Sequence, residues 1–108
     1  MFRLQATFPD LCDELGRLFL KLGEQRLASE VSALEIRDRC RCSDDFCATM
    51  FVRPRPRSGV EGQTGRTVDM ESEDGYLIVD IVDDHIAEIE ILYRDEVRSR
   101  LNELMPIV

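Results

Sequence analysis

The strongest constraint on the fold is the alternation of apolar side chains between Tyr76 and Tyr93. Apolar residues recur here with a period of two, which is typical of a strand with one buried face. A reversal at Asp84-His85-Ile86 would pair the apolar residues on one side: Ile81 with Ile89, Val79 with Ile91, and Leu77 with Tyr93. The sequence therefore predicts a β-hairpin here.

Residues 33–53 predict a second hairpin. The strands are expected over 33–42 and 47–53, joined by a polar turn at Ser43–Phe46. Strict alternation places two sets of side chains on opposite faces: Leu34, Ile36, Asp38, Cys40 and Cys42 on one, and Glu35, Arg37, Arg39 and Arg41 on the other. Val68 and Met70 indicate a further short strand before the 76–93 hairpin.

Helices are expected at both ends of the chain. Apolar residues spaced by three and four predict a helix over 8–22 that ends at Gly23. A short helical turn is expected over 24–31, and a last helix over 94–105. We therefore predict one α+β domain over residues 1–108, in which an N-terminal and a C-terminal helix pack on one face of an antiparallel sheet of four to five strands.

The net charge of −8 is unevenly distributed. Residues 37–66 hold seven arginines against four acids (+3), whereas residues 67–108 hold three arginines against twelve acids (−9). An acidic protein is repelled by nucleic acid and by anionic membranes, so neither is an expected partner. No apolar run approaches the length of a membrane span, and the N-terminus lacks the layout of a signal peptide, so we expect a cytoplasmic protein.

An Arg/Pro/Gly-rich loop is expected at about 53–66, and it suggests a binding surface. Arg53, Arg55 and Arg57 would project the same way from an extended segment and contact an acidic protein partner. The competing interpretation is a solvated loop. Since no catalytic signature is found, the sequence favours a non-enzymatic binding protein. It would be a monomer or a weak homodimer.

Three cysteines of the 33–53 hairpin give the alternative function. A four-residue turn places Cys42 directly opposite Cys47, with Cys40 on the same face. Three interpretations stay open: burial as small apolar side chains, a reversible Cys42–Cys47 disulfide or reactive thiol, and a zinc site with Cys12 or His85 as fourth ligand.

One segment resembles small bacterial domains of unknown function, and a second resembles a family of hypothetical proteins. One is Gly75-Tyr76-Leu77-Ile78-Val79-Asp80 together with Ile86 to Leu92, which ends in Ile-Glu-Ile-Leu. The other is the turn from Cys42 to Cys47 with Asp44-Asp45-Phe46. The resemblance implies a paired-strand unit and brings no activity, so it assigns no functional residue.

Overall fold

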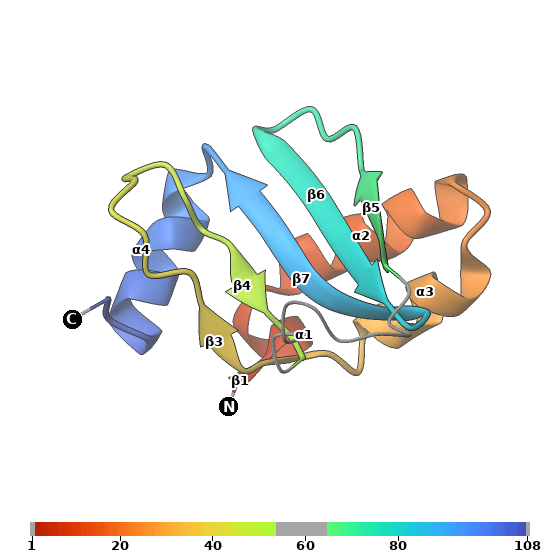
Figure 1. The fold of residues 1–108 in the computed structure, drawn as a ribbon, viewed down its shortest axis with the longest axis horizontal. Coiled ribbons are helices and arrows are strands. Elements are labelled where there is room, and N and C mark those ends of the chain that lie inside the picture. The colour runs from red at the N-terminus through yellow and green to blue at the C-terminus, as the bar shows by residue number, and fades with distance from the viewer. Residues whose placement is uncertain (1, 54–64, 108) are drawn as a thin grey trace.

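The computed structural model describes residues 2–53 and 65–107, and it contains four helices and seven strands in that part of the chain (Figure 1). The helices are α1 (Leu4–Thr7), α2 (Pro9–Lys21), α3 (Gln25–Val31) and α4 (Asp95–Leu104). The strands are β1 (Phe2–Arg3), β2 (Glu35–Ile36), β3 (Asp38–Arg39), β4 (Met50–Phe51), β5 (Gly65–Asp69), β6 (Tyr76–Val82) and β7 (His85–Leu92).

Five strands form one antiparallel sheet in the order β3-β4-β7-β6-β5, and β1 and β2 form a separate antiparallel pair. This confirms the predicted α+β class and the antiparallel sheet. In Figure 1, α2 and α3 lie behind the five-stranded sheet. The packing of both terminal helices on a single face stays a prediction, although α4 contributes Val97 and Leu101 to the common core.

The predicted helices are confirmed. α2 lies within the predicted range 8–22 and begins with Pro9. Proline is tolerated there because the N–H groups in the first turn of a helix have no acceptor within the helix, so the N–H that proline lacks is not needed. Gly23 follows α2 with a φ of +79°, the left-handed conformation expected of a residue that ends a helix. No helix of the described residues is long and apolar enough to cross a membrane.

The β6–β7 hairpin is confirmed, but its predicted register is wrong by two residues. The chain reverses at Asp83-Asp84, which both have positive φ, and Val82 pairs with His85. The register shifts between Asp80 and Ile81, so that Val79 pairs with Ile89. The predicted buried face is otherwise correct, since Leu77, Val79, Ile81, Ile89 and Ile91 are all buried.

Tyr93 does not belong to that buried face. Its side chain is 56% exposed and its φ is +64°, which is unusual for an aromatic residue. The neighbouring Gly75 fixes this geometry, because a Cβ at that position would lie 2.3 Å from the Leu92 carbonyl oxygen and 3.1 Å from that of Tyr93. Gly75 and the Leu92–Tyr93 backbone therefore pack too closely for any other residue at position 75.

A buried ion pair ties the end of β7 to α2. The Arg94 guanidinium is 5% exposed and donates to both carboxylate oxygens of Glu14, at 2.7 and 2.8 Å. It also donates to the Ser72 hydroxyl and the Asp74 carbonyl. The bidentate pair and these two bonds fix the β5–β6 connection against α2.

In the β3–β4 hairpin, the predicted assignment of side chains to the two faces of the sheet is wrong from Arg37 onward. Asp38 pairs with Phe51, yet the amide of Arg37 also donates to the Phe51 carbonyl, so two consecutive residues oppose one. Such a bulge reverses the alternation that Leu34 and Ile36 begin. Arg39, predicted to face outward, is therefore buried.

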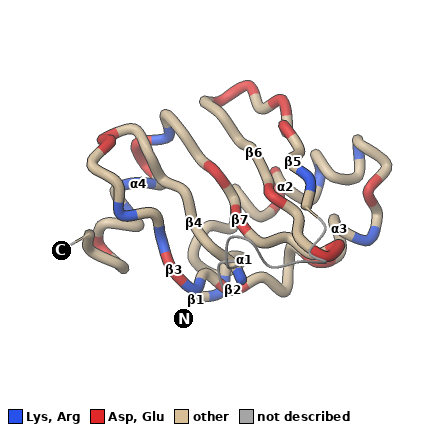
Figure 2. The backbone as a smooth tube through the Cα atoms, viewed as in Figure 1, with Lys and Arg blue, Asp and Glu red and all other residues tan. Residues whose placement is uncertain are grey.

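The predicted loop at 53–66 ends earlier than expected, because β5 begins at Gly65. Arg53 is described and exposed, whereas Arg55 and Arg57 lie outside the described residues. Figure 2 shows basic positions along β3 at one edge of the sheet, and acidic positions in the β5–β6 connection and the β6–β7 turn. The uneven charge of the sequence is thus also uneven in space.

Candidate functional site

The sulfur atoms of Cys40, Cys42 and Cys47 lie within 4.8 Å of one another. The β3–β4 register explains this arrangement. Arg39 pairs with Met50, and the Cys40 amide donates to the Thr49 carbonyl, so the same register places Cys42 opposite Cys47. The chain reverses between them, with the Cys47 amide directed at the Asp44 carbonyl at 3.4 Å. The predicted convergence of the three thiols is confirmed.

The cluster lies on the side of the sheet opposite the main core. Cys47 bridges to Leu92, whereas the adjacent Ala48 belongs to the core cluster. Cys47 is buried, and Cys40 and Cys42 are partly exposed, so solvent reaches the site from one side. A metal ion or an oxidant therefore has access to Cys40 and Cys42 without opening the core.

Neither predicted fourth ligand belongs to this group. Cys12 is buried in α2, where its thiol is directed at the Val31 carbonyl at 3.8 Å. His85 begins β7 and lies 3.4 Å from Glu30. Among the described residues that could bind a metal, only the three hairpin cysteines form a close group, and their geometry leaves one coordination position of a tetrahedral ion for an external ligand.

The thiols of Cys40 and Cys47 differ in acidity. Burial raises the pKa of Cys40 to about 11, because the thiolate loses hydration. Burial acts in the same direction on Cys47, but hydrogen bonds from the side chain and backbone of Thr49 and from the Cys42 and Cys40 thiols stabilise its thiolate and lower its pKa. The pKa of Cys47 is therefore shifted in the opposite direction to that of Cys40.

The same hairpin contains a buried positive charge, Arg39, which interacts electrostatically with Cys40 and Cys47. Its side chain is 2% exposed, and its guanidinium donates to the Cys40 carbonyl at 3.2 Å, to Asn102 Oδ1 at 2.6 Å and to the Met105 carbonyl at 3.3 Å. All three acceptors are neutral. Burial and the nearby charge of Arg98 lower the pKa of Arg39, whereas the thiolates of Cys47 and Cys40 act to raise it. Arg39 and the two thiols thus interact electrostatically.

A group of aromatic rings borders the cluster. Phe46 stacks on Tyr93 with ring centroids 4.9 Å apart, and Tyr76 lies 5.7 Å from Tyr93. The Tyr93 amide donates to the Phe46 carbonyl, which joins the cysteine turn to the end of β7. These contacts hold the cysteine turn against the end of β7.

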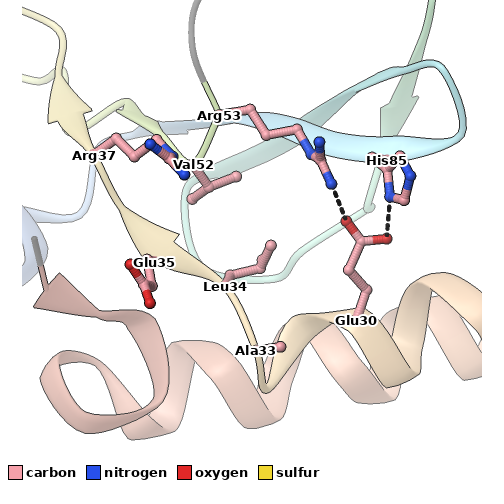
Figure 3. A pocket seen from close by; sticks show the side chains of 8 residues that line it. All are labelled: Glu30, Ala33, Leu34, Glu35, Arg37, Val52, Arg53 and His85. Atoms are coloured by element: carbon pink, nitrogen blue, oxygen red, sulfur yellow. Dashed lines mark hydrogen bonds and ion pairs between the residues drawn. The ribbon is translucent and has the colours of Figure 1, made fainter.

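A second charged site is a cavity of about 420 Å³ where the end of α3, β2 and the chain after β4 meet the start of β7 (Figure 3). Its lining combines charged and apolar side chains: Glu30, Glu35, Arg37, Arg53 and His85 with Ala33, Leu34 and Val52. The predicted site residue Arg53 lies here, and its guanidinium is 3.9 Å from the carboxylate of Glu30.

The sequence reasoning missed Arg39, Arg37 and Glu30. Arg39 was placed on the wrong face, because the bulge at Arg37 and Asp38 leaves no clear mark in the sequence. Glu30 and His85 are 55 residues apart and meet only through the packing of α3 beside β7. The only available sign was the unusual number of arginines between residues 37 and 66.

Comparisons with protein-family models, with curated proteins and with solved structures find no match to this chain. The resemblance of its hairpins to small bacterial domains therefore stays a prediction, and the function has to be inferred from the sites themselves.

Proposed function

We propose that this protein binds a thiophilic divalent metal ion, with Zn²⁺ as the first candidate, through Cys40, Cys42 and Cys47. The observation that carries the proposal is the approach of the three sulfur atoms to within 4.8 Å of one another. In a tetrahedral zinc site with Zn–S bonds of about 2.3 Å, the sulfurs lie roughly 3.8 Å apart. Small side-chain rotations bring the thiols to that spacing.

The local charge favours a divalent ion. Three thiolates and one divalent cation carry a charge of −1, which the buried guanidinium of Arg39 balances. A buried charge without a counter-charge is strongly unfavourable, and within the described residues the hydrogen bonds of this guanidinium go to neutral oxygens. Thiolate ligands are also the soft donors that zinc accepts and that Mg²⁺ and Ca²⁺ do not.

With three protein ligands, the ion keeps a position for water or another donor. Structural zinc sites use four protein ligands, whereas sites that exchange or activate a bound molecule keep one position open. The proposed site therefore serves reversible metal binding or ligand exchange at the metal. Since the thiols must lose protons to bind, metal affinity should fall as the pH is lowered.

The test is metal stoichiometry on protein purified without chelator. We expect about one Zn²⁺ per chain, and a thiolate-to-metal charge-transfer band when Co²⁺ replaces Zn²⁺. Cys42→Ser should abolish both. Cys12→Ala is the matched control, because it removes a cysteine outside the group and should keep both. Absence of stoichiometric metal in the unmodified protein, or equal loss in the control, would reject the proposal.

A second candidate function is a reversible Cys42–Cys47 disulfide, which the register favours because the two residues are opposed. The two thiols would lose two protons and two electrons to a disulfide oxidant such as oxidised glutathione, which is reduced to two thiols. Mass spectrometry should then show a loss of two hydrogens that Cys47→Ser abolishes. If bound Zn²⁺ blocks this oxidation, both reactions use the same sulfurs.

The prediction of an acidic protein partner at Arg53, Arg55 and Arg57 stays open. Arg53 is exposed and lies beside the cavity, which supports a role in binding anionic groups. Its two sequence neighbours of the same kind lie outside the described residues.

A further inference from the structure

The helix α4 is held at its two ends by two different arginines. At its start, Arg94 forms the bidentate ion pair with Glu14 of α2. At its end, the guanidinium of Arg39 donates to Asn102 Oδ1 at 2.6 Å and to the Met105 carbonyl at 3.3 Å. Arg39 belongs to β3, which lies beside α4 in Figure 1. The end of α4 is therefore tied to the hairpin that carries the three thiols.

The tie at the end of α4 has the chemistry of a helix cap. The last carbonyl groups of a helix have no partner within the helix, and a cation close to them is stabilising. Arg39 supplies this cation from another strand, and its side chain is buried. The same guanidinium donates through Nε to the Cys40 carbonyl at 3.2 Å. One side chain thus joins the backbone of a cysteine to Asn102, which is 63 residues further along the sequence.

A second arginine opposes this contact. Arg98 lies one turn before Asn102 on α4, and its Nε–H is buried without an acceptor in the part of the chain that the structure describes. The positive charge of Arg98 also acts against that of Arg39. Neither arginine forms an ion pair with a described residue. Docking of the end of α4 therefore brings two like charges together, which lowers the stability of this attachment.

The attachment can be lost through β3. This strand is the outer strand of the five-stranded sheet, and its ladder contains only Asp38 and Arg39. A strand of this kind can open locally while the rest of the sheet stays folded. Opening would move Arg39 away from α4 and break its bonds to Asn102 and Met105 together. Leu101 and Met105, which pack in or against the core, would then lose part of their cover.

A metal ion at the thiols would oppose this opening. Cys40 follows β3 and Cys47 precedes β4, so an ion bound to both sulfurs joins the two sides of the hairpin. The three thiols release their protons when they bind a metal, and three thiolates with one divalent ion carry a charge of −1. Because Cys40 and Cys47 interact electrostatically with Arg39, this charge attracts the guanidinium and offsets its repulsion by Arg98. Both effects keep Arg39 at the end of α4.

We propose that metal binding at the cysteine cluster holds the C-terminal end of α4 against the sheet through Arg39, and that loss of the metal releases it. The inference rests on the proposed metal site and adds a regulated element to it. Release uncovers apolar surface of Leu101 and Met105, so metal occupancy controls access to this surface. The coupling is reciprocal: a change that weakens the attachment of α4 weakens metal binding by the same factor.

The test is amide hydrogen exchange of the ¹⁵N-labelled full chain, followed by NMR with and without Zn²⁺. The Met105 amide donates to the Leu101 carbonyl and reports on the end of α4, whereas the Arg98 amide donates to the Arg94 carbonyl and reports on its start. We expect Zn²⁺ to slow exchange at Met105 by about fivefold or more, as is typical of coupled sites. Exchange at Arg98 should change far less, because Arg94 anchors this end independently of the thiols.

Asn102→Ala removes the closest acceptor of Arg39 without changing a cysteine. It should strongly reduce the slowing by Zn²⁺ at Met105, and it should weaken the Zn²⁺ affinity, measured by competition with a chelator, by about the same factor. Glu103→Ala is the matched control, because Glu103 is the next residue of α4, and its side chain is 67% exposed. The control should keep both the slowing and the affinity.

The outcomes separate this inference from the metal site itself. Stoichiometric Zn²⁺ binding with unchanged exchange at Met105, or with equal slowing at Met105 and Arg98, would overturn the coupling and leave the metal site standing. An unchanged Zn²⁺ affinity in Asn102→Ala, or an equal loss in Glu103→Ala, would overturn it as well. A chain that binds no stoichiometric Zn²⁺ would overturn both proposals.

Discussion

The β3–β4 and β6–β7 hairpins both join two antiparallel strands, but they differ in the length of their ladders and in the side chains that they carry. The β6–β7 hairpin pairs seven residues on each strand, and one face of it forms the centre of the core. In the β3–β4 hairpin only two residues of each strand are paired, its outer strand is the edge of the sheet, and it carries a buried arginine and three thiols. The comparison teaches that the chemically reactive side chains lie in the hairpin with the shorter ladder, although Ala48, Met50 and Val52 of that hairpin also belong to the core.

The strongest test of this separation is a pair of substitutions. Ile89→Ala removes a fully buried side chain of β7 and should lower the free energy of unfolding by about 2–5 kcal/mol. Cys42→Ser, in the partly exposed turn, should cost less than about 1 kcal/mol in metal-free protein. Urea denaturation measures both. Equal losses of unfolding free energy would mean that the cysteine turn contributes as much to stability as the core of the β6–β7 hairpin.

The next test concerns the ion pair that holds the β6–β7 side against α2. The hydrogen bond from Arg94 lowers the pKa of Glu14 below its ordinary value of 4.5, although burial opposes this. Because the pKa of Glu14 is lower in the folded protein than in the unfolded chain, its ionised carboxylate stabilises the fold at pH values above the unfolded-state pKa. This stabilisation is lost as the pH falls through the folded-state pKa. Arg94→Met should lower stability at pH 7 by about 3 kcal/mol and flatten its decline below pH 5.

Arg100→Met provides the control for that measurement, because its ion pair with Glu103 is exposed on both sides. It should leave the pH profile unchanged. A variant at Arg94 with the unmodified pH profile would show that Glu14 owes its acidity to another group.

A smaller effect is expected at the β6–β7 turn. Asp83 and Asp84 both have positive φ, where residues other than glycine are strained, and Asp-Gly is a favoured pair in such two-residue turns. Asp84→Gly should therefore raise the free energy of unfolding by less than about 1 kcal/mol, because the greater freedom of glycine in the unfolded chain offsets part of the relieved strain. Thermal denaturation compared with Asp45→Gly, in the cysteine turn, would show whether the gain is specific to the strained position.

The smallest effect is predicted for Arg41, beside the thiols. Arg41 pairs with Asp38, but the two side chains are 46% and 47% exposed. Such pairs contribute about 0–1 kcal/mol, so Arg41→Ala should leave stability nearly unchanged. A large loss, measured by urea denaturation, would mean that the cysteine hairpin depends on its surface charges.

The parts of the fold that depend on periodicity could be predicted from the sequence. The apolar spacing of residues 8–22 defines α2, and the period of two defines the buried face of β6 and β7. The β6–β7 register could not be predicted, because the two-residue turn at Asp83-Asp84 has no glycine and the strand irregularity near Asp80 carries no sequence mark. The pairing register of two strands depends on the turn and on such irregularities, whereas the period of the apolar side chains within a strand does not.

The thiol site was predictable because it is local. Four residues separate Cys42 from Cys47, so the turn alone brings them together. The charges that surround the sites were not predictable, since Arg39 meets Asn102 of α4, 63 residues away, and Glu30 meets His85 only when α3 packs beside β7. Contacts of this kind follow from the whole packing arrangement and have no sequence pattern of their own.

Because β3 lies at the edge of the sheet, binding of a ligand to the three thiols should change how often this strand opens. An outer strand with two paired residues can detach by a local fluctuation that leaves β6 and β7 intact. A ligand bridging residues 40, 42 and 47 would suppress that opening, so amide hydrogen exchange between residues 38 and 51 should slow while the central strands keep their own rates. The amide exchange rates of the cysteine hairpin would then distinguish the bound protein from the free protein.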